Sequence, residues 1–322
     1  MEFDLIELIR QRTAQPRDDV HLGIGDDAAL LAVPAGKELV VAIDTLVDGV
    51  HFPHGTAASD IGWKALAVNL SDLAAMGASP AWALLALTLP QADPAFVDGF
   101  AAGFAQLARP HRLALVGGDT TRGPLCISVA AHGFVPPGKA LTRSGAHVGD
   151  ALLVTGTLGD AAAGLHALQQ PWRDDDPHAS ARDFLIARLH RPVPRLAAGM
   201  ALRAQASACI DISDGLLADL GHICRASAVG AEIDAALLPR SPALLQLHDD
   251  ATALHFALSG GDDYELCFSV PMHRLADVQA DLARLGCGVT RIGRIVEGSG
   301  VRVRGHDGAW LPIDRQGWEH FA

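Results

Sequence analysis

The feature that most constrains this chain is a recurring pattern in which glycine or another small residue precedes aspartate beside an apolar segment. The first copy is Gly-Ile-Gly-Asp-Asp at residues 23–27, directly before the apolar residues 28–31. Glycine lets the backbone turn tightly or approach a ligand closely. Neighbouring carboxylates repel one another, so a bound cation is a natural reason for both to stay ionised. An ordinary turn is the simpler explanation of any single copy.

The pattern recurs along the whole chain, which a single turn does not explain. Several copies lie where an apolar run ends, and loops at such positions often carry function. We therefore hypothesise that these acids form one site for Mg²⁺ and a nucleotide. The further acids of the pattern are Asp44, Asp48, Asp72, Asp119, Asp211, Asp214, Asp262 and Asp263.

Composition limits the class of protein. A chain of 322 residues, 49% of them hydrophobic, has enough apolar material for two globular domains. The net charge of −12 argues against nucleic acid or an anionic membrane as partner, whereas ATP can still bind if metal ions mediate the contact. Five cysteines without a CxxC motif indicate reduced thiols in a cytoplasmic protein. The acidic N-terminus lacks the basic flank of a signal peptide.

Apolar periodicity predicts mixed strands and helices in the first half of the chain. A buried strand at 39–44 is expected to deliver Asp44 to a loop, and a helix is expected to begin at Ser59 and end before Gly77. The charge-free stretch 73–92 contains glycine and proline, so we interpret it as a helix end, a turn and a strand of a soluble protein. The other expected elements are helices at 3–13 and 94–109 and strands at 82–89, 113–117 and 125–135.

Pro-Pro-Gly at 136–138 marks the predicted domain boundary, which separates residues 1–137 from residues 138–322. In the second half, a turn at 211–214 is expected to begin a helix. The other expected elements are strands at 151–155, 207–210, 265–270, 289–296 and 301–304, and helices after residue 160 and at 180–190, 194–203 and 272–285.

Several polar side chains have both a structural and a functional interpretation. Asp72 lies among apolar helix residues, so it needs a partner, which is a backbone amide, Lys64 or a metal ion. Arg143 is either a phosphate clamp in a Ser/Thr/Gly loop or an exposed loop charge. Ser213 and Asp214 suit a helix N-cap, and the same helix N-terminus suits a phosphate.

Two other residues also have both a structural and a functional interpretation. The common nucleotide-binding motifs are absent. His51 suits either a structural role or contact with a phosphate or aromatic ligand. Trp318 is either packed back as a lid or stacked on a ligand. The acidic run 174–176 is interpreted as solvated. The chain has no P-loop, no G-x-S-x-G, no H-E-x-x-H and no protein-kinase motif, so ATP would need another architecture.

Seven segments together resemble the thiamine-monophosphate kinase family, which belongs with aminoimidazole-ribonucleotide synthetase and selenophosphate synthetase. They occur in the family's order and span nearly the whole chain. The segments are GIGDD (23–27), DTLVDGVHF (44–52), NLSDLAAMG (69–77), GGDTTRG (117–123), LTRSG (141–145), DISDG (211–215) and GGDDYEL (260–266).

The resemblance implies an α/β (α+β) protein with a two-domain aminoimidazole-ribonucleotide-synthetase-like fold. Residues 1–137 would form the domain that binds ATP and Mg²⁺ and pairs its sheet across a homodimer in a barrel-like interface. Residues 138–322 would form an α+β domain that completes the nucleotide and substrate site. The implied reaction is direct transfer of the γ-phosphoryl group of ATP to thiamine monophosphate, the last step of thiamine diphosphate biosynthesis.

The resemblance also implies roles for individual residues. The implied ligands of several Mg²⁺ ions are Asp27, Asp44, Asp72, Asp119, Asp211 and Asp214. The implied ATP contacts are Gly118, Asp119, Arg143 and Ser213. The implied contacts to thiamine monophosphate are His51, Asp262 and Trp318.

Two departures from the family pattern bear on the site. Hydroxyl residues often precede the acid equivalent to Asp44, but this chain has Ala42 and Ile43. One or two oxygen ligands are therefore missing, so backbone carbonyls or water would have to replace them. The usual Gly-Gly-Glu-Asp is Gly-Gly-Asp-Asp here, which makes Asp262 one methylene shorter than the family's glutamate.

The implied chemistry does not require a catalytic base. The acceptor phosphate has a second pKa of about 6 and is largely a dianion at neutral pH. The difficulty is to bring two polyanions together, which calls for positioning and positive charge. We therefore expect in-line displacement assisted by Mg²⁺, with no residue acting as general base.

Two alternatives remain at this stage. One is a related ATP-dependent synthetase that acts on another acceptor through the same metal site. A selenophosphate synthetase would have a reactive cysteine near its N-terminus, whereas the first cysteine here is Cys126, and a hydrogenase-maturation relative would end in cysteine. The other is a non-catalytic protein that binds a nucleotide or divalent ion, which turnover would distinguish from a kinase.

Overall fold

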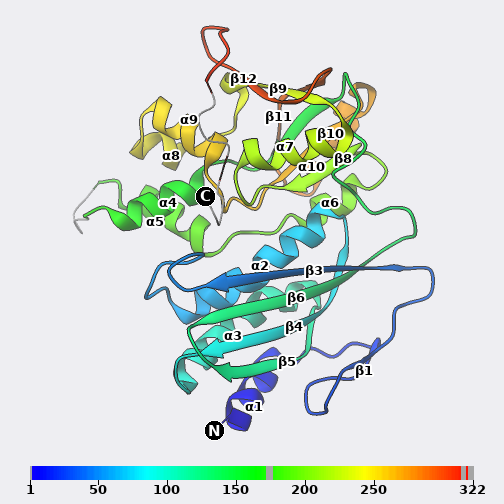
Figure 1. The fold of residues 1–322 in the computed structure, drawn as a ribbon, viewed down its shortest axis with the longest axis vertical. Coiled ribbons are helices and arrows are strands. Elements are labelled where there is room, and N and C mark those ends of the chain that lie inside the picture. Colours follow the sequence, from blue (N-terminus) through cyan, green and yellow to red (C-terminus); the bar gives the residue numbers. More distant parts are fainter. Residues whose placement is uncertain (1, 172–176, 313–316, 318–322) are drawn as a thin grey trace. The chain divides into compact units, whose positions relative to one another are not determined.

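The computed structural model describes residues 2–171, 177–312 and 317, which fall into two compact units (Figure 1). The N-terminal unit comprises Met1–Leu73 and Ala78–Gly138, and the C-terminal unit comprises Ala74–Gly77 and Lys139–Ala322. Each unit has its own sheet and its own covering helices, so each can be understood separately.

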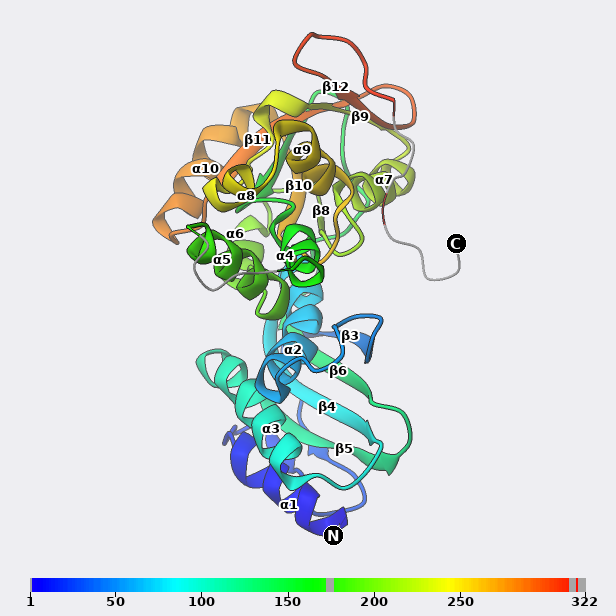
Figure 2. The same cartoon turned by 90° about the vertical axis from the view of Figure 1, so that its left-hand side faces the viewer.

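The N-terminal unit is built on a four-stranded sheet in the order β3-β6-β4-β5. β4 and β5 run parallel, and the other neighbours run antiparallel. Helices α2 and α3 lie on one face of this sheet (Figure 2). The elements are α1 Glu2–Thr13, β1 Val20–Leu22, β2 Leu30–Leu31, β3 Glu38–Val47, α2 Ala58–Ala75, β4 Ser79–Leu89, α3 Pro94–Ala108, η1 Arg109–His111, β5 Ala114–Arg122 and β6 Cys126–Val135.

Glycines allow α2 and α3 to cross at short range. A Cβ atom on Gly62 would lie 2.0 Å from the carbonyl oxygen of Phe100, and one on Gly103 would lie 1.8 Å from that of Ser59. Any larger residue would push the helices apart. Because α2 carries Asp72, this close crossing also positions one of the predicted metal ligands.

The face of β3 that carries Leu39, Val41 and Ile43 is open in the single chain. These side chains are 43%, 56% and 67% exposed. The prediction of a buried strand at 39–44 is therefore wrong, because β3 is an edge strand with one uncovered face in the described part of the chain. The strand also continues to Val47, so Asp44 lies within it and not in a following loop.

The C-terminal unit is built on a six-stranded sheet in the order β12-β9-β11-β7-β10-β8. Only β12 and β9 are parallel neighbours among these strands. The elements are β7 Ala151–Thr155, α4 Asp160–Gln169, α5 Ala179–His190, α6 Leu196–Leu202, β8 Ala208–Asp211, α7 Leu216–Ser227, β9 Gly230–Asp234, η2 Ala235–Leu237, α8 Pro242–Leu247, α9 Asp250–Ser259, β10 Leu266–Val270, η3 Met272–Arg274, α10 Leu275–Arg284, β11 Val289–Val296 and β12 Gly300–Arg304.

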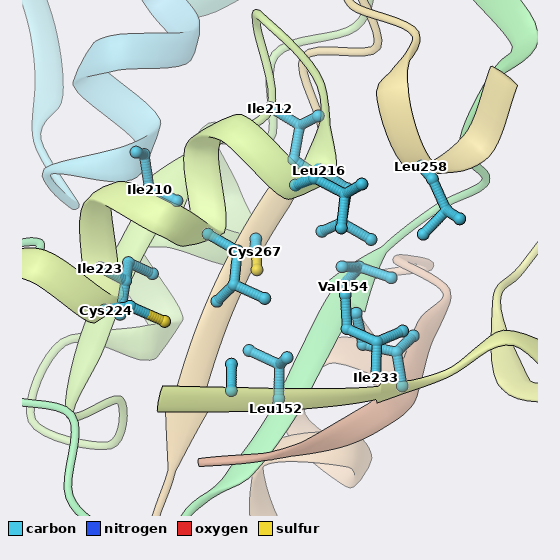
Figure 3. Packing of buried hydrophobic residues seen from close by; sticks show 14 of the residues in the cluster. Leu152, Val154, Ile210, Ile212, Leu216, Ile223, Cys224, Ile233, Leu258 and Cys267 are labelled. Atoms are coloured by element: carbon cyan, nitrogen blue, oxygen red, sulfur yellow. The ribbon is translucent and has the colours of Figure 1, made fainter. Parts of the chain in front are cut away.

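Alternate residues of the central strands bury one face of this sheet under α7 and α9 (Figure 3). Leu152 and Val154 of β7 meet Leu216 and Ile223 of α7 and Leu258 of α9 in one apolar cluster. Complete burial of a side chain of this size contributes roughly 1.5–3 kcal/mol. The cluster anchors α7 and thereby the loop that precedes it.

Candidate functional site

A cavity of about 840 Å³ in the N-terminal unit brings together two of the recurring Gly-Asp segments. Asp26, Asp27 and Asp119 line it, and all three are exposed. Apolar side chains of α1 and of the sheet complete the wall. The other lining residues are Phe3, Ile6, Ile9, Ile24, Gly25, Ala28, Ala29, Leu31, Leu84, Leu85, Leu115, Val116, Gly117, Gly118, Thr120 and His132. The cavity therefore has an acidic part and an apolar part.

The segment that carries Asp27 is anchored to the sheet by Asp19. Arg17 donates to both carboxylate oxygens of Asp19, at 2.8 and 2.6 Å, and the indole Nε1 of Trp82 donates at 3.2 Å. The Arg17 hydrogen bond is the main cause that lowers the pKa of Asp19. A charged and an aromatic partner thus hold the chain just before the Asp27 loop against β4.

Gly118 lines the cavity and allows β5 to lie close against β4. Its φ is +154°, and a Cβ atom there would lie 1.8 Å from the carbonyl oxygen of Leu85. The sequence predicted that the strand ends at residue 117, but β5 continues to Arg122. Pairing with β4 keeps the strand extended through the glycines, so Asp119 is held in a sheet.

Helix α2 and β3 are joined by a buried asparagine beside Asp44. The amide oxygen of Asn69 accepts from the backbone N–H of Asp44 at 3.1 Å, and its Nδ2 donates to the carbonyl of Ala65 at 3.1 Å. Asn69 is fully buried, and Asp44 and Asp72 are half-buried. The partner of the Asp72 carboxylate stays a prediction, with a backbone amide, Lys64 and a metal ion as the alternatives.

The loop after β3 fixes the ring of His51. The Nδ1 atom of His51 lies 3.0 Å from the backbone N–H of Val47 and accepts from it. Nδ1 must then be unprotonated, so Nε2 carries the proton and is a donor. The buried Lys64 donates to the carbonyl of His51 at 3.0 Å. The ring is therefore held in one orientation and one tautomer.

In the C-terminal unit, Asp211 ends β8, and the loop between β8 and α7 carries Ser213 and Asp214. Its backbone amides converge on Asp219, a residue that the sequence interpretation missed. The Oδ2 atom of Asp219 accepts from the amides of Ser213, Asp214 and Gly215 at 3.0, 3.0 and 3.1 Å. Neither Ser213 nor Asp214 is the N-cap, because Gly215 occupies that position without a side-chain cap.

Burial is the main cause that raises the pKa of Asp219 to about 8, and the nearby charges of Asp211 and Asp214 add to it. Three carboxylates therefore repel one another at this loop. Arg143 lies near the same loop. Burial lowers the pKa of His222, and so do the nearby charges of Arg225 and Arg143, whereas the charge of Asp214 raises it. The structure thus gathers several predicted residues of this unit around one loop.

The Gly-Gly-Asp-Asp segment lies directly beside that loop. The amide of Asp262 donates to the carbonyl of Ser213 at 2.8 Å, and the Tyr264 hydroxyl donates to the Asp262 carboxylate at 2.9 Å. Asp262 adopts a left-handed backbone with φ of 67°. A smaller cavity of about 300 Å³ borders Gly260, Gly261 and Gly317.

The acids that follow Asp262 have structural roles. Asp263 is buried and accepts from the amides of Gly159 and Ala161 at 2.7 and 3.4 Å, at the start of α4. Glu265 is fully buried and pairs with Arg188 at 2.9 Å and with Arg195. These two acids therefore do not belong to the nucleotide site that the recurring pattern suggested.

The missed residues left weak signals in the sequence. Asp219 is an acid in the first turn of a helix that begins at Asp-Gly, a position at which a side chain can reach back to amides of the helix start. Asn69 is a polar residue in an otherwise apolar helix. Both patterns indicate a buried hydrogen bond, but neither identifies its partner.

Some predicted residues cannot be placed. Trp318 and the acidic run 174–176 lie outside the described residues.

Within the described ranges, no group of three or more His, Cys, Asp or Glu residues is arranged to hold a metal ion. No helix there is both long and apolar enough to cross a membrane.

Comparison with known proteins first defines the class. Residues 25–135 match the AIR synthase related protein N-terminal domain, and residues 147–306 match the AIR synthase related protein C-terminal domain. The chain is thus a two-domain AIR synthase related protein, which confirms the predicted fold class.

Individual relatives identify the family within this class. Thiamine-monophosphate kinase of Escherichia coli (strain K12) is 50% identical over 321 residues, covering 100% of this chain and 98% of that protein. The crystal structure of thiamine-monophosphate kinase from Stenotrophomonas maltophilia K279a shares 52% identity with a TM-score of 0.88, covering 96% of this chain and 98% of that one. The structure of AaThiL complexed with AMPPCP and TMP shares 33% identity with a TM-score of 0.79, covering 99% and 97%. The chain belongs to the thiamine-monophosphate kinase family.

Proposed function

We propose that this protein is a phosphotransferase that converts ATP and thiamine monophosphate to ADP and thiamine diphosphate. The observation that carries the proposal is the acidic cavity of the N-terminal unit in a chain 50% identical, over its whole length, to a thiamine-monophosphate kinase. A relative has been solved with AMPPCP, an ATP analogue, and TMP, the abbreviation of thiamine monophosphate. This reaction is the last step of thiamine diphosphate biosynthesis, and we place it in the cytoplasm.

The cavity suits ATP in both of its parts. Its volume of about 840 Å³ is in the range of nucleotide and drug-sized sites. Phe3, Ile6 and Leu115 provide an apolar wall for a base, and Gly118, which also lines the cavity, is a proposed contact to the nucleotide. Residues 1–137 would thus bind most of the nucleotide. Arg143 and Ser213 of the second domain, residues 138–322, are the further proposed ATP contacts, and His51, Asp262 and Trp318 are the proposed substrate contacts.

The donor atoms of the cavity fit Mg²⁺. This ion is commonly bound by one or two carboxylates, while water and substrate phosphates fill its remaining positions. Asp27 and Asp119 provide such oxygens without forming a closed protein site. The further proposed ligands are Asp44, Asp72, Asp211 and Asp214. When bound, Mg²⁺ would neutralise charge on the phosphates during in-line transfer.

The residues themselves would position the two anions. His51 presents an Nε2–H donor, which suits a phosphate oxygen of the acceptor. The acceptor phosphate is largely dianionic at neutral pH and attacks without a base. Catalysis would therefore depend on orientation and on charge stabilisation, as in other phosphoryl transfers.

The test is incubation of the purified protein with ATP, Mg²⁺ and thiamine monophosphate, with thiamine diphosphate measured by chromatography. Asp27→Asn should lower the rate at least tenfold, whereas Asp18→Asn, an exposed acid outside the cavity, should not. ATP binding without thiamine diphosphate formation would refute the kinase and favour a synthetase for another acceptor or a binding protein.

We also propose that the open face of β3 forms a homodimer interface. Leu39, Val41 and Ile43 present a continuous apolar strip, and water exposure of such a strip is unfavourable. Light scattering after size exclusion should report a dimer, and Val41→Asp with Ile43→Asp should convert it to monomer. Val193→Asp, at a comparably exposed apolar residue of the C-terminal unit, should leave the mass unchanged. A monomeric wild-type protein would refute the interface.

A further inference from the structure

Asp219 is the shared acceptor of three consecutive backbone amides in the C-terminal unit. Its side chain is buried, at 3% exposure, in the first turn of α7. One oxygen, Oδ2, accepts from Ser213, Asp214 and Gly215 at 3.0 to 3.1 Å. This single oxygen therefore satisfies the donors of all three loop amides.

The other side of the same loop is held by the Gly-Gly-Asp-Asp segment and its strand. The carbonyl of Ser213 accepts from the amide of Asp262 at 2.8 Å, and the carbonyl of Ile212 accepts from Tyr264 at 2.9 Å. Gly215 has a φ of 124°, and a Cβ atom there would meet the backbone of Ser259 at 2.9 Å. The loop is therefore fixed through its carbonyls by one element and through its amides by Asp219.

The hydrogen bonds to Asp219 limit how the loop can bind a nucleotide. Amides at a helix start commonly bind phosphate directly. Here the three amides already donate to the Asp219 side chain, so they are not available to a phosphate. What the loop can offer a nucleotide is thus its side chains, namely the hydroxyl of Ser213 and the carboxylates of Asp211 and Asp214.

We propose that Asp219 is a positioning residue of the phosphoryl-transfer site, which orients Ser213 and Asp214 toward MgATP and excludes phosphate from the loop amides. This inference rests on the proposed function. Asp219 itself does not touch the nucleotide. Loss of its carboxylate would free the amides and let Ser213 and Asp214 move, so MgATP affinity should depend on a side chain buried beneath the loop.

The test compares Asp219→Ala, which removes the acceptor of the three amides, with Asp249→Ala. Asp249 is the control, because its carboxylate also accepts a backbone amide, that of Thr252 at 2.8 Å, but at the start of α9, away from this loop. For each protein we would measure MgATP binding by calorimetry, the half-saturating Mg²⁺ concentration, KM and kcat, and the melting temperature. Asp219→Ala should weaken MgATP binding and raise the half-saturating Mg²⁺ concentration by about tenfold, whereas Asp249→Ala should only lower the melting temperature.

Asp219→Glu is the second variant, since it keeps a carboxyl group but displaces it, and it should show a smaller shift of the same kind. Wild-type MgATP affinity in folded Asp219→Ala would overturn the proposal. An equal shift in Asp249→Ala would overturn it as well, as would failure of both Asp219 variants to fold. Because calorimetry measures binding without turnover, the result is separate from whether the wild-type protein makes thiamine diphosphate.

Discussion

The aspartates of the two units follow the same sequence pattern but are in different physical states. In the N-terminal unit, Asp26, Asp27 and Asp119 are exposed and line a cavity. In the C-terminal unit, Asp263 of the same pattern is buried and accepts backbone amides, and so does Asp219, which lies outside the pattern. The first group is available to a cation or ligand, whereas the second group holds loops and helix ends in place.

The difference shows that burial and partners, and not the Gly-Asp pattern, separate ligand-binding acids from structural ones. A buried carboxylate is tolerated only with hydrogen bonds or an opposite charge. Glu265 illustrates this, since Thr155 Oγ1 donates to it at 2.6 Å and two arginines pair with it. An exposed carboxylate at a cavity has no such requirement, so a ligand-binding role explains its position better.

The largest expected effect is on stability in the C-terminal unit. Glu265→Gln leaves Arg195 without its buried counter-charge and leaves Arg188 with only Asp160, 3.7 Å away, and removal of one partner of a buried pair costs about 3–5 kcal/mol. Denaturant unfolding should show this loss. Glu232→Gln is the control, because Glu232 pairs with the exposed Arg294 and Arg302, and surface pairs contribute about 0–1 kcal/mol. Equal losses in the two variants would break the comparison.

The next effect is on activity in the N-terminal unit. Asp119→Asn should lower kcat/KM for ATP at least about 100-fold, a loss typical of removing one group that stabilises transition-state charge. The free energy of unfolding should change by no more than about 0.5 kcal/mol, since the side chain is exposed. Steady-state kinetics and denaturant unfolding of the same preparation test both halves. A large loss of stability would assign Asp119 to the structural group.

The smallest effects should separate two adjacent acids. Asp262→Asn keeps a residue that tolerates a left-handed backbone, so it should leave stability unchanged and raise KM for thiamine monophosphate by up to about tenfold, the value of one hydrogen bond. Asp263→Asn should instead lower the free energy of unfolding by about 1–2 kcal/mol, as loss of a helix cap does. If both variants changed the same quantity, the assignment of separate roles would fail.

Much of the fold and part of the candidate site could be predicted from the sequence. Periodicity placed the strand at 151–155 and the helix at 94–109 within a residue or two of the structure. It failed for β3 and β5. The apolar residues of β3 look like those of a buried strand, although no other described part of the chain covers one face of β3. The glycines of β5 look like a turn, although pairing with β4 keeps them extended.

The sequence by itself determined the family, the two-domain organisation and which aspartates deserved testing, because these depend on residue order and local periodicity. Only the tertiary structure decided which acids line a cavity and which are internal hydrogen-bond acceptors. Asp262 and Asp263 are neighbours in the chain, yet one pairs with Tyr264 beside the loop and the other caps α4. Such a division depends on contacts between segments about 100 residues apart, and local sequence patterns carry no information about those contacts.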